Sequence, residues 1–353
     1  MTFVIGRQRA DPSAGQTARL GTYRARDGSR GADLALDVDG PHAILVVGKR
    51  GYGKSYTLGV LAEALACTRG LAPVVVDPMG GFATLAEPAA GDVSVPATVI
   101  PEPTVPPAAL DPRSWCRVLG LSPESGAGGL VWQAAAGAET LPEMCEQVRA
   151  SDAPAADVRA AVNHLDLARS WGVFDADGLS AARLATSPVT VLDVSGLDAA
   201  PMNAVVRTVA EGLYRARVSD TIDRLPWLLV DEAHAFVDGV AAGALETLLT
   251  RGRAPGVSLV LATQRPSAVS DVAVSQSDVL VAHRLTARAD LEALASARPT
   301  YLDATLEERL PTAPGDVLVV DDVTESVHAA RIRDRHTPHG GASPSLQSAG
   351  EGR

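Results

Sequence analysis

Runs of consecutive apolar residues alternate along this chain with segments whose apolar residues recur at helical spacing. Ala43–Val47 and Pro73–Asp77 are two such runs, and Tyr56–Cys67 between them has the spacing of a helix. A continuous apolar run is typical of a parallel strand buried on both faces, so the alternation predicts an α/β fold with a mostly parallel sheet flanked by helices. Further runs of the same kind occur at Val189–Asp193, Leu225–Val230, Val257–Thr263, Val279–Val281 and Val317–Val320.

The same pattern divides the chain into four parts. Residues 1–40 hold two short β-like pieces around a turn-rich stretch, which predicts a short N-terminal β-hairpin extension. Residues 41–333 form the α/β domain, in which residues 84–187 pass from a proline-rich stretch into alanine-rich helical segments and are expected to be a mainly helical insertion. Residues 334–353 are rich in Gly, Ser, Pro and His and predict a disordered tail.

The first apolar run is followed by a glycine-rich turn of the form G-x-x-x-x-G-K-S/T, spanning Gly48–Ser55. Backbone N–H groups of such a turn point at phosphate oxygens, and the helix that follows adds the positive end of its dipole. Lys49 and Lys54 are the only lysines in the chain, while the other 29 basic residues are arginines. We therefore expect a nucleoside triphosphate site formed by Gly48, Gly51, Tyr52, Gly53, Lys54, Ser55 and Tyr56.

Two carboxylates, Asp231 and Glu232, follow the apolar run Leu225–Val230. Ligands bind at the carboxyl ends of strands in open α/β sheets. Asp231 together with Ser55 could hold Mg²⁺, and Glu232 could polarise an attacking water, so the pair predicts ATP hydrolysis with Mg²⁺ as cofactor. Two carboxylates at a strand end are often only a solvated terminus, but their joint occurrence with the glycine-rich turn favours the catalytic interpretation.

Gln264 ends the next apolar run and could sense the γ-phosphate or the attacking water. The alternative interpretation is that Gln264 is a polar residue that only caps the strand. Arg253 lies just before that run and is a candidate for an arginine that reaches a neighbouring subunit's γ-phosphate, with a solvated surface arginine as the equally weighted alternative. His234 is more typical of a structural histidine than of a catalytic base.

Composition limits the classes of partner. The net charge of −11 argues against a surface coated with nonspecific nucleic-acid contacts, although a basic channel inside an acidic shell is compatible with it. Three scattered cysteines make neither a metal motif nor a disulfide framework. Because no apolar run is long enough to span a membrane and the N-terminus lacks the pattern of a secretory signal, we expect a cytoplasmic protein without membrane contact.

These motifs together resemble the HerA/FtsK family of P-loop ATPases, in particular archaeal HerA-like proteins. The resemblance extends over roughly residues 40–333. It implies a RecA-like P-loop NTPase fold, a hexameric ring, ATP sites shared between subunits, DNA in the central pore, and a NurA-type nuclease as a possible partner in DNA end processing. The residues that carry it are Gly48–Ser55, Asp77–Gly80, Leu229–His234, Arg251–Arg253, Leu261–Ser267, Ser275–Ser277 and His283–Thr286.

HerA-like proteins usually begin with a longer β-barrel domain, for which about 40 residues before the first buried strand are too few. We therefore expect ring assembly to depend more strongly on nucleotide, DNA or a separate partner. The leading hypothesis is an ATP-driven DNA translocase or helicase. The alternatives are a P-loop ATPase that remodels or assembles a protein partner without DNA, and a slowly hydrolysing structural module, which the intact Asp231 and Glu232 disfavour.

Overall fold

The computed structural model describes residues 2–7, 15–25, 28–88, 95–296 and 309–339. Within these residues, twelve strands form one sheet in the order β1-β3-β2-β12-β11-β10-β4-β9-β8-β5-β7-β6. The strands are β1 (Thr2–Ile5), β2 (Thr17–Arg24), β3 (Arg30–Asp37), β4 (Ala43–Val47), β5 (Leu71–Asp77), β6 (Ala97–Ile100), β7 (Val189–Asp193), β8 (Leu225–Val230), β9 (Ser258–Thr263), β10 (Val279–Ala282), β11 (Asp316–Asp321) and β12 (Ser326–Ile332).

The sheet has a parallel part and an antiparallel part. From β10 to β6 every neighbouring pair of strands is parallel, which confirms the predicted α/β class. Strands β11, β12, β2 and β3 continue the sheet in antiparallel pairs, and β1 pairs with β3 in parallel. The expected N-terminal hairpin exists as β2 and β3, but it is joined to the central sheet through β12 and carries a third strand, β1, which the sequence pattern does not predict.

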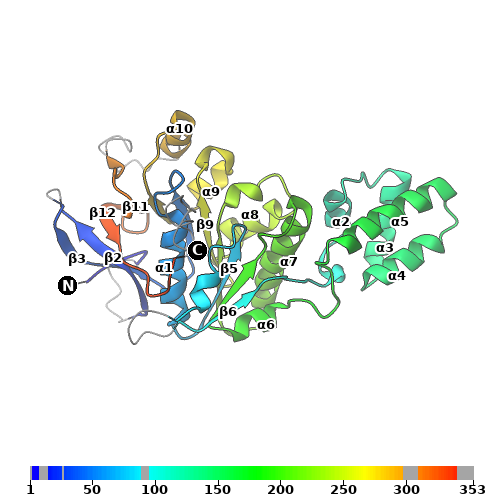
Figure 1. Ribbon diagram of the computed structural model, residues 1–353, viewed down its shortest axis with the longest axis horizontal. Helices are drawn as coiled ribbons and strands as arrows, with labels where there is room; N and C mark the ends of the chain where they lie inside the picture. Colours follow the sequence, from blue (N-terminus) through cyan, green and yellow to red (C-terminus); the bar gives the residue numbers. More distant parts are fainter. Residues whose placement is uncertain (1, 8–14, 26–27, 89–94, 297–308, 340–353) are drawn as a thin grey trace, which may run out of the picture.

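Helices cover both faces of the parallel part (Figure 1). Along β8, Leu228 and Val230 pack with residues of α7 and α8 on one face, while Trp227 and Leu229 pack with residues of α1 on the other. Because both faces are buried, the strand is a continuous apolar run rather than an alternating one. The helices are α1 (Lys54–Ala66), α2 (Pro112–Val118), α3 (Gly126–Gly137), α4 (Leu141–Arg149), α5 (Ala155–Ser170), α6 (Ala181–Thr186), α7 (Ala199–Val218), α8 (Ala242–Arg251), α9 (Asp271–Ser275) and α10 (Arg288–Ser296).

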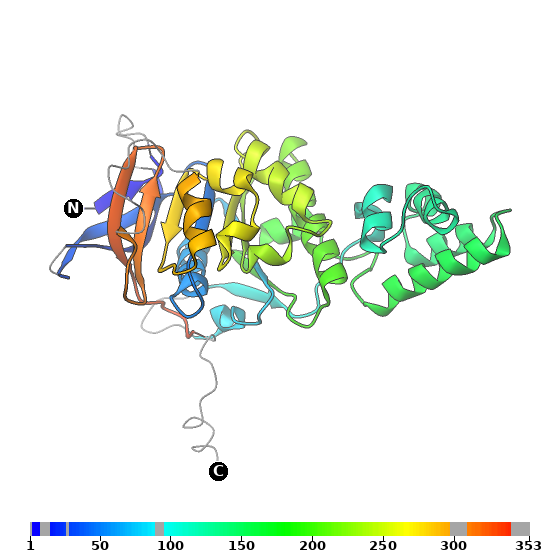
Figure 2. The same cartoon turned by 90° about the horizontal axis from the view of Figure 1, so that it is seen from above.

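Helices α2–α5 form a separate lobe beside the sheet (Figures 1 and 2). The core of the lobe is built around Trp115 and Leu165 and includes Ala204 of α7 and Val240 from the main body. Asp111 before α2 also forms a 2.9 Å ion pair with Arg207 of α7. The predicted insertion at residues 84–187 was too wide. It also contains β6, which is the edge strand of the central sheet, and α6, whose Leu184 belongs to the main core.

The chain leaves β12 along α1. Residues 334–339 were expected to begin a disordered tail, but the backbone N–H groups of His336 and Thr337 donate to the buried carboxylate of Glu63. A buried carboxylate is stable only with hydrogen-bond donors, so these bonds hold the segment against α1. Residues 340–353, the rest of the expected tail, lie outside the described residues. In the described part of the chain, no helix combines the length and the apolar character that crossing a membrane requires.

Candidate nucleotide site

Three predicted site segments meet at one edge of the sheet. Gly48–Ser55 follows β4, Asp231 follows β8, and Gln264 follows β9. Strand β9 lies between β4 and β8 and pairs with both in parallel, so the carboxyl ends of the three strands are adjacent. This is the edge at which open α/β sheets bind ligands.

Two glycines give the loop Gly48–Ser55 its shape. Gly53 precedes α1 with a φ of 106°, a left-handed conformation that side chains other than glycine rarely adopt. A Cβ atom on Gly48 would lie 2.5 Å from Cβ of His283, so only glycine lets the loop lie this close to the end of β10. The loop thus packs against His283 at the end of β10, and its backbone N–H groups lie at the start of α1.

Lys54 is the first residue of α1, and only 5% of its surface is exposed. Burial lowers the pKa of its ammonium group, while the nearby Glu232 and Asp231 favour the charged form. Among the described residues, none makes a hydrogen bond or an ion pair with this ammonium group. A buried cation without a partner is costly, so the position suits a residue whose partner is a bound anion such as a phosphate.

Ser55 and Asp231 are 176 residues apart in sequence, yet the Ser55 hydroxyl donates a 2.6 Å hydrogen bond to Oδ2 of Asp231. Asp231 is only 1% exposed, and burial raises the pKa of its carboxyl group, partly offset by the hydrogen bond from Ser55. A hydroxyl beside a carboxylate matches the oxygen ligands that Mg²⁺ takes when phosphates and water complete its shell. The two residues therefore fit a Mg²⁺–nucleotide complex.

Glu232 has φ 46° and ψ 45°, a left-handed conformation that costs a residue other than glycine on the order of 1–3 kcal/mol. Its Oε2 is buried, makes no hydrogen bond with the residues that the structure describes, and lies 3.2 Å from Nδ1 of His234. The same nitrogen is 3.4 Å from Oγ1 of Thr263, the last residue of β9. His234 thus lies between Glu232 and the neighbouring strand end, a contact that the sequence alone did not indicate.

The two remaining predicted residues differ in position. Gln264 is half-buried directly after Thr263, beside the loop and the carboxylates. Arg253 precedes the amino end of β9, so it lies at the opposite ends of the strands from the loop Gly48–Ser55. Its side chain is 71% exposed and lies 3.9 Å from Asp278. The fold therefore does not bring Arg253 to the phosphate loop of its own subunit, and its role across an interface stays a prediction.

His283 is a site residue that the sequence reading did not single out. It follows β10, is fully buried beneath the loop, and its Nε2 lies 3.0 Å from Oγ1 of Thr57 in α1. Burial, assisted by the charge of Lys54, lowers the pKa of its imidazole to about 4. His283 belongs to the stretch His283–Thr286 that carries the family resemblance. Its position directly after an apolar run was the only feature of the sequence that could have indicated its place in the site.

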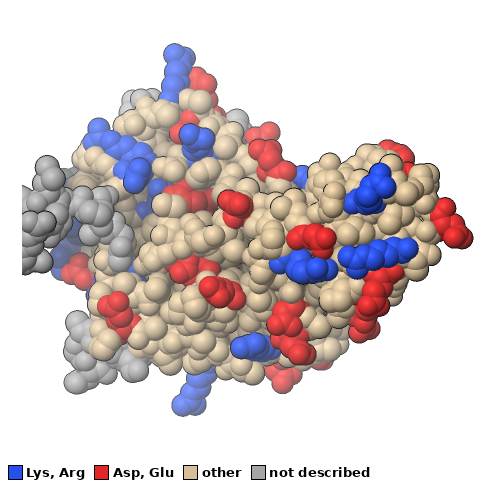
Figure 3. All heavy atoms as spheres, turned by 45° about the vertical axis from the view of Figure 1, so that its right-hand side comes forward, with Lys and Arg blue, Asp and Glu red and all other residues tan. Residues whose placement is uncertain are grey.

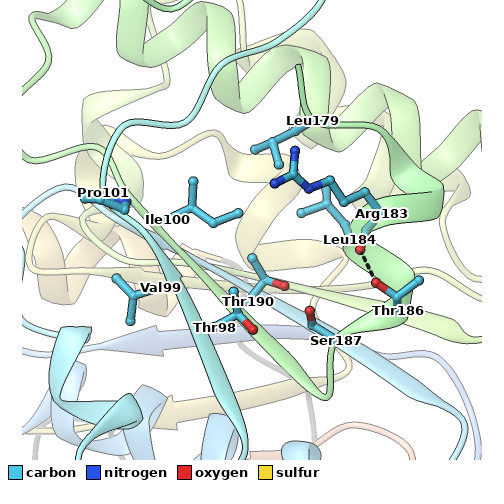
Figure 4. A pocket seen from close by; sticks show the side chains of 10 residues that line it. All are labelled: Thr98, Val99, Ile100, Pro101, Leu179, Arg183, Leu184, Thr186, Ser187 and Thr190. Atoms are coloured by element: carbon cyan, nitrogen blue, oxygen red, sulfur yellow. Dashed lines mark hydrogen bonds between the residues drawn. The ribbon is translucent and has the colours of Figure 1, made fainter. Parts of the chain in front are cut away.

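A cavity of about 350 Å³ lies at the far edge of the sheet, between β6, β7 and α6. Figure 4 shows Leu179, Leu184 and the Arg183 side chain above it, with the hydroxyl groups of Thr98, Thr186 and Ser187 below. Strand β6 is separated from β4 by β9, β8, β5 and β7, so this cavity has no part in phosphate binding.

Comparison with known sequences decides the family. The model described as "Helicase HerA, central domain" matches residues 19–211, more than half of the chain. The chain belongs to the HerA central-domain family. As a HerA-family member it is a P-loop ATPase of the HerA/FtsK type, in agreement with the resemblance noted from its motifs. No curated protein sequence gives a significant match to it.

Solved structures show the same fold. VirB4 of Thermoanaerobacter pseudethanolicus aligns with a TM-score of 0.65 and 18% identity over 92% of this chain and 97% of its own. The bacterial conjugative coupling protein TrwBdeltaN70 aligns with a TM-score of 0.57 and 15% identity over 96% of both chains. The plasmid coupling protein TrwB in complex with ADP and Mg²⁺ aligns with a TM-score of 0.57 and 15% identity over 84% of this HerA-family chain and 86% of TrwB.

Proposed function

We propose that this HerA-family ATPase is an ATP-dependent DNA translocase or helicase that hydrolyses ATP at the subunit interfaces of a ring. The observation that supports it best is the hydrogen bond between Ser55 and Asp231, beside a buried Lys54 that makes no hydrogen bond or ion pair with any other described residue. This arrangement suits a hydrolytic nucleotide site rather than a glycine-rich turn of purely structural use. The family adds the expectation that hydrolysis drives movement along DNA.

Each residue then has a distinct part in hydrolysis. Lys54 binds the β- and γ-phosphates, and Ser55 and Asp231 would hold Mg²⁺, which when bound neutralises charge on the phosphate oxygens. Glu232 accepts a proton from the attacking water, and the nearby His234 keeps its carboxylate at the strand end. Gln264 orients the water or the γ-phosphate from the end of β9.

Arg253 would act from the neighbouring subunit. It is exposed at the edge opposite its own phosphate loop, which is the placement expected of a residue that completes a partner's site. A homo-oligomeric ring, hexameric as the family resemblance implies, supplies that interface. Sharing a site between subunits would couple hydrolysis to the state of the ring.

DNA is the proposed track along which the ATPase moves, and a NurA-type nuclease is the proposed partner in DNA end processing. On the face of the molecule that carries the helical lobe, acidic and basic side chains are interspersed (Figure 3). With a net charge of −11, binding would depend on a few arginines along a pore rather than on this outer face. Affinity for DNA would accordingly fall with salt and show weak sequence preference.

Two variants separate binding from hydrolysis. Lys54→Ala removes the charge that meets the phosphates and should abolish most ATP binding, measured by calorimetry. Glu232→Gln keeps that charge but loses the proton acceptor, so it should bind ATP as the parent does and lose turnover by roughly 100-fold or more. Normal ATP binding by Lys54→Ala, or parental turnover by Glu232→Gln, would contradict the assignment of the site.

DNA dependence separates the translocase from a protein-remodelling ATPase. ATP turnover should rise on addition of DNA in a sample shown to be assembled, and the rise should disappear in Glu232→Gln while DNA binding persists. Turnover that no single- or double-stranded DNA changes, across a series of salt concentrations, would favour the protein-remodelling alternative.

A further inference from the structure

The segment that follows β12 is fixed along the helix that begins at the phosphate loop. Glu63, only 1% exposed on α1, accepts hydrogen bonds from the backbone N–H groups of His336 and Thr337, from the Thr337 hydroxyl, and from Arg333 at 2.8 Å. Burial alone would raise the pKa of this carboxyl group, but these donors together lower it. Glu63 is therefore an ionised anchor for the segment.

From this anchor the segment runs toward the phosphate loop. Arg335 lies against Gly59, where a Cβ atom would be 2.8 Å from the guanidinium carbon, and its backbone N–H donates a 2.7 Å hydrogen bond to the Tyr56 hydroxyl. The ring of His339 then meets the ring of Tyr56 edge to face, with centroids 5.2 Å apart and an interplanar angle of 76°. Tyr56 is the residue directly after Ser55, so an aromatic pair lies one residue beyond the phosphate loop.

The direction of a bound nucleotide follows from the site already described. The β- and γ-phosphates lie at Lys54 and at the Ser55–Asp231 pair, on the side of β4 that faces β9 and β8. A nucleotide held there has its α-phosphate and nucleoside free to extend over the other side of β4. Strand β10 borders β4 on that side, followed by β11 and β12, and the segment with Arg335 and His339 continues from β12.

We propose that Tyr56 and the segment Arg335–His339 form the base side of the nucleotide site, where the base stacks on one ring of the edge-to-face pair Tyr56–His339 and meets the other ring at its edge. The inference deepens the proposed function and rests on it. Tyr56 is half-buried and His339 is exposed, so part of the surface of this pair is accessible to a ligand. Stacking tolerates any base, because every base has a π-face, and favours the larger purines.

The segment Arg335–His339 would then take part in nucleotide binding. Glu63 would act as a positioning residue, because it holds the segment without touching the nucleotide. Its loss would free His339 from Tyr56 and leave the phosphate contacts in place.

The test compares ATP with inorganic tripolyphosphate, which has the phosphates but no base. Calorimetry with Mg²⁺ measures both dissociation constants for the parent, Tyr56→Leu and His339→Ala. Removal of an aromatic stacking surface should weaken ATP binding by roughly 5- to 150-fold, the range typical of base–aromatic stacking, while tripolyphosphate binding changes less than about twofold. Tyr56→Phe retains the ring and should bind ATP nearly as the parent does, and His164→Ala on α5, remote from the site, serves as the matched histidine control.

Three results would overturn the inference. Unchanged ATP affinity in both Tyr56→Leu and His339→Ala would show that the base does not lie there. An equal loss of ATP and tripolyphosphate affinity would show that the residues shape only the phosphate loop. If the parent bound neither compound, the proposed nucleotide site would fail and this inference with it, whereas either of the first two results leaves that site intact.

Discussion

Acidification is predicted to destabilise the protein through His283 beneath the phosphate loop. Its pKa of about 4, against an ordinary 6.5, means that the folded state holds this imidazole neutral. The corresponding stability is fully present above pH 6.5 and is lost as the pH falls toward 4, because the unfolded chain takes up the proton first. The difference between the two values amounts to roughly 3 kcal/mol in total, of which roughly 2 kcal/mol is lost by pH 5.

The assay compares the parent with His283→Gln, which cannot titrate. Urea unfolding followed by circular dichroism gives the free energy of unfolding of each protein at several pH values between 7 and 5. His283→Gln is expected to be less stable at pH 7, but the gap should narrow by roughly 2 kcal/mol at pH 5, since all other groups titrate in both proteins. Equal pH dependence in the two proteins would refute the reasoning.

Two further predictions concern other contacts. Glu63→Gln should lower the free energy of unfolding by roughly 3–5 kcal/mol, because it leaves the buried Arg333 and Arg335 side chains without their anion. The control Glu146→Gln, on the exposed face of α4, should change the free energy of unfolding by less than about 0.5 kcal/mol. Equal effects of the two substitutions in urea unfolding would contradict the role of Glu63 as an anchor. Arg253→Ala should abolish ATP hydrolysis alone but recover part of it when mixed with Lys54→Ala, since a mixed interface pairs an intact loop with an intact arginine; a mixture as inactive as its components would argue against shared sites.

The positions of the glycine-rich loop and the carboxylate pair in the fold could be predicted because each is a short, local motif. The loop Gly48–Ser55 and the pair Asp231–Glu232 each follow a buried parallel strand, and parallel strands of this kind are continuous apolar runs. Their adjacency follows from the fold class. The family match confirms the resemblance drawn from these motifs.

Other elements lacked such a pattern. The sequence of strand β12 is interrupted by His328 and Arg331, and Arg331 lies on a face that is mostly exposed, so the strand shows no apolar run. Strand β6 has only four residues, and none of them is fully buried. The place of residues 334–339 depends on Glu63, roughly 270 residues earlier, and local composition carries no information about such a partner. His283 is similar, since its role arises from the close approach of Gly48.

Displacement of a third strand from duplex DNA tests the central claim most directly. A motor that moves along a duplex removes a triplex-forming oligonucleotide from its path, and the release is measured by fluorescence. The account predicts ATP-dependent displacement by the assembled parent and none by Glu232→Gln under the same conditions. Steady ATP hydrolysis by the assembled, DNA-bound parent without any displacement would contradict the claim that this ATPase translocates DNA.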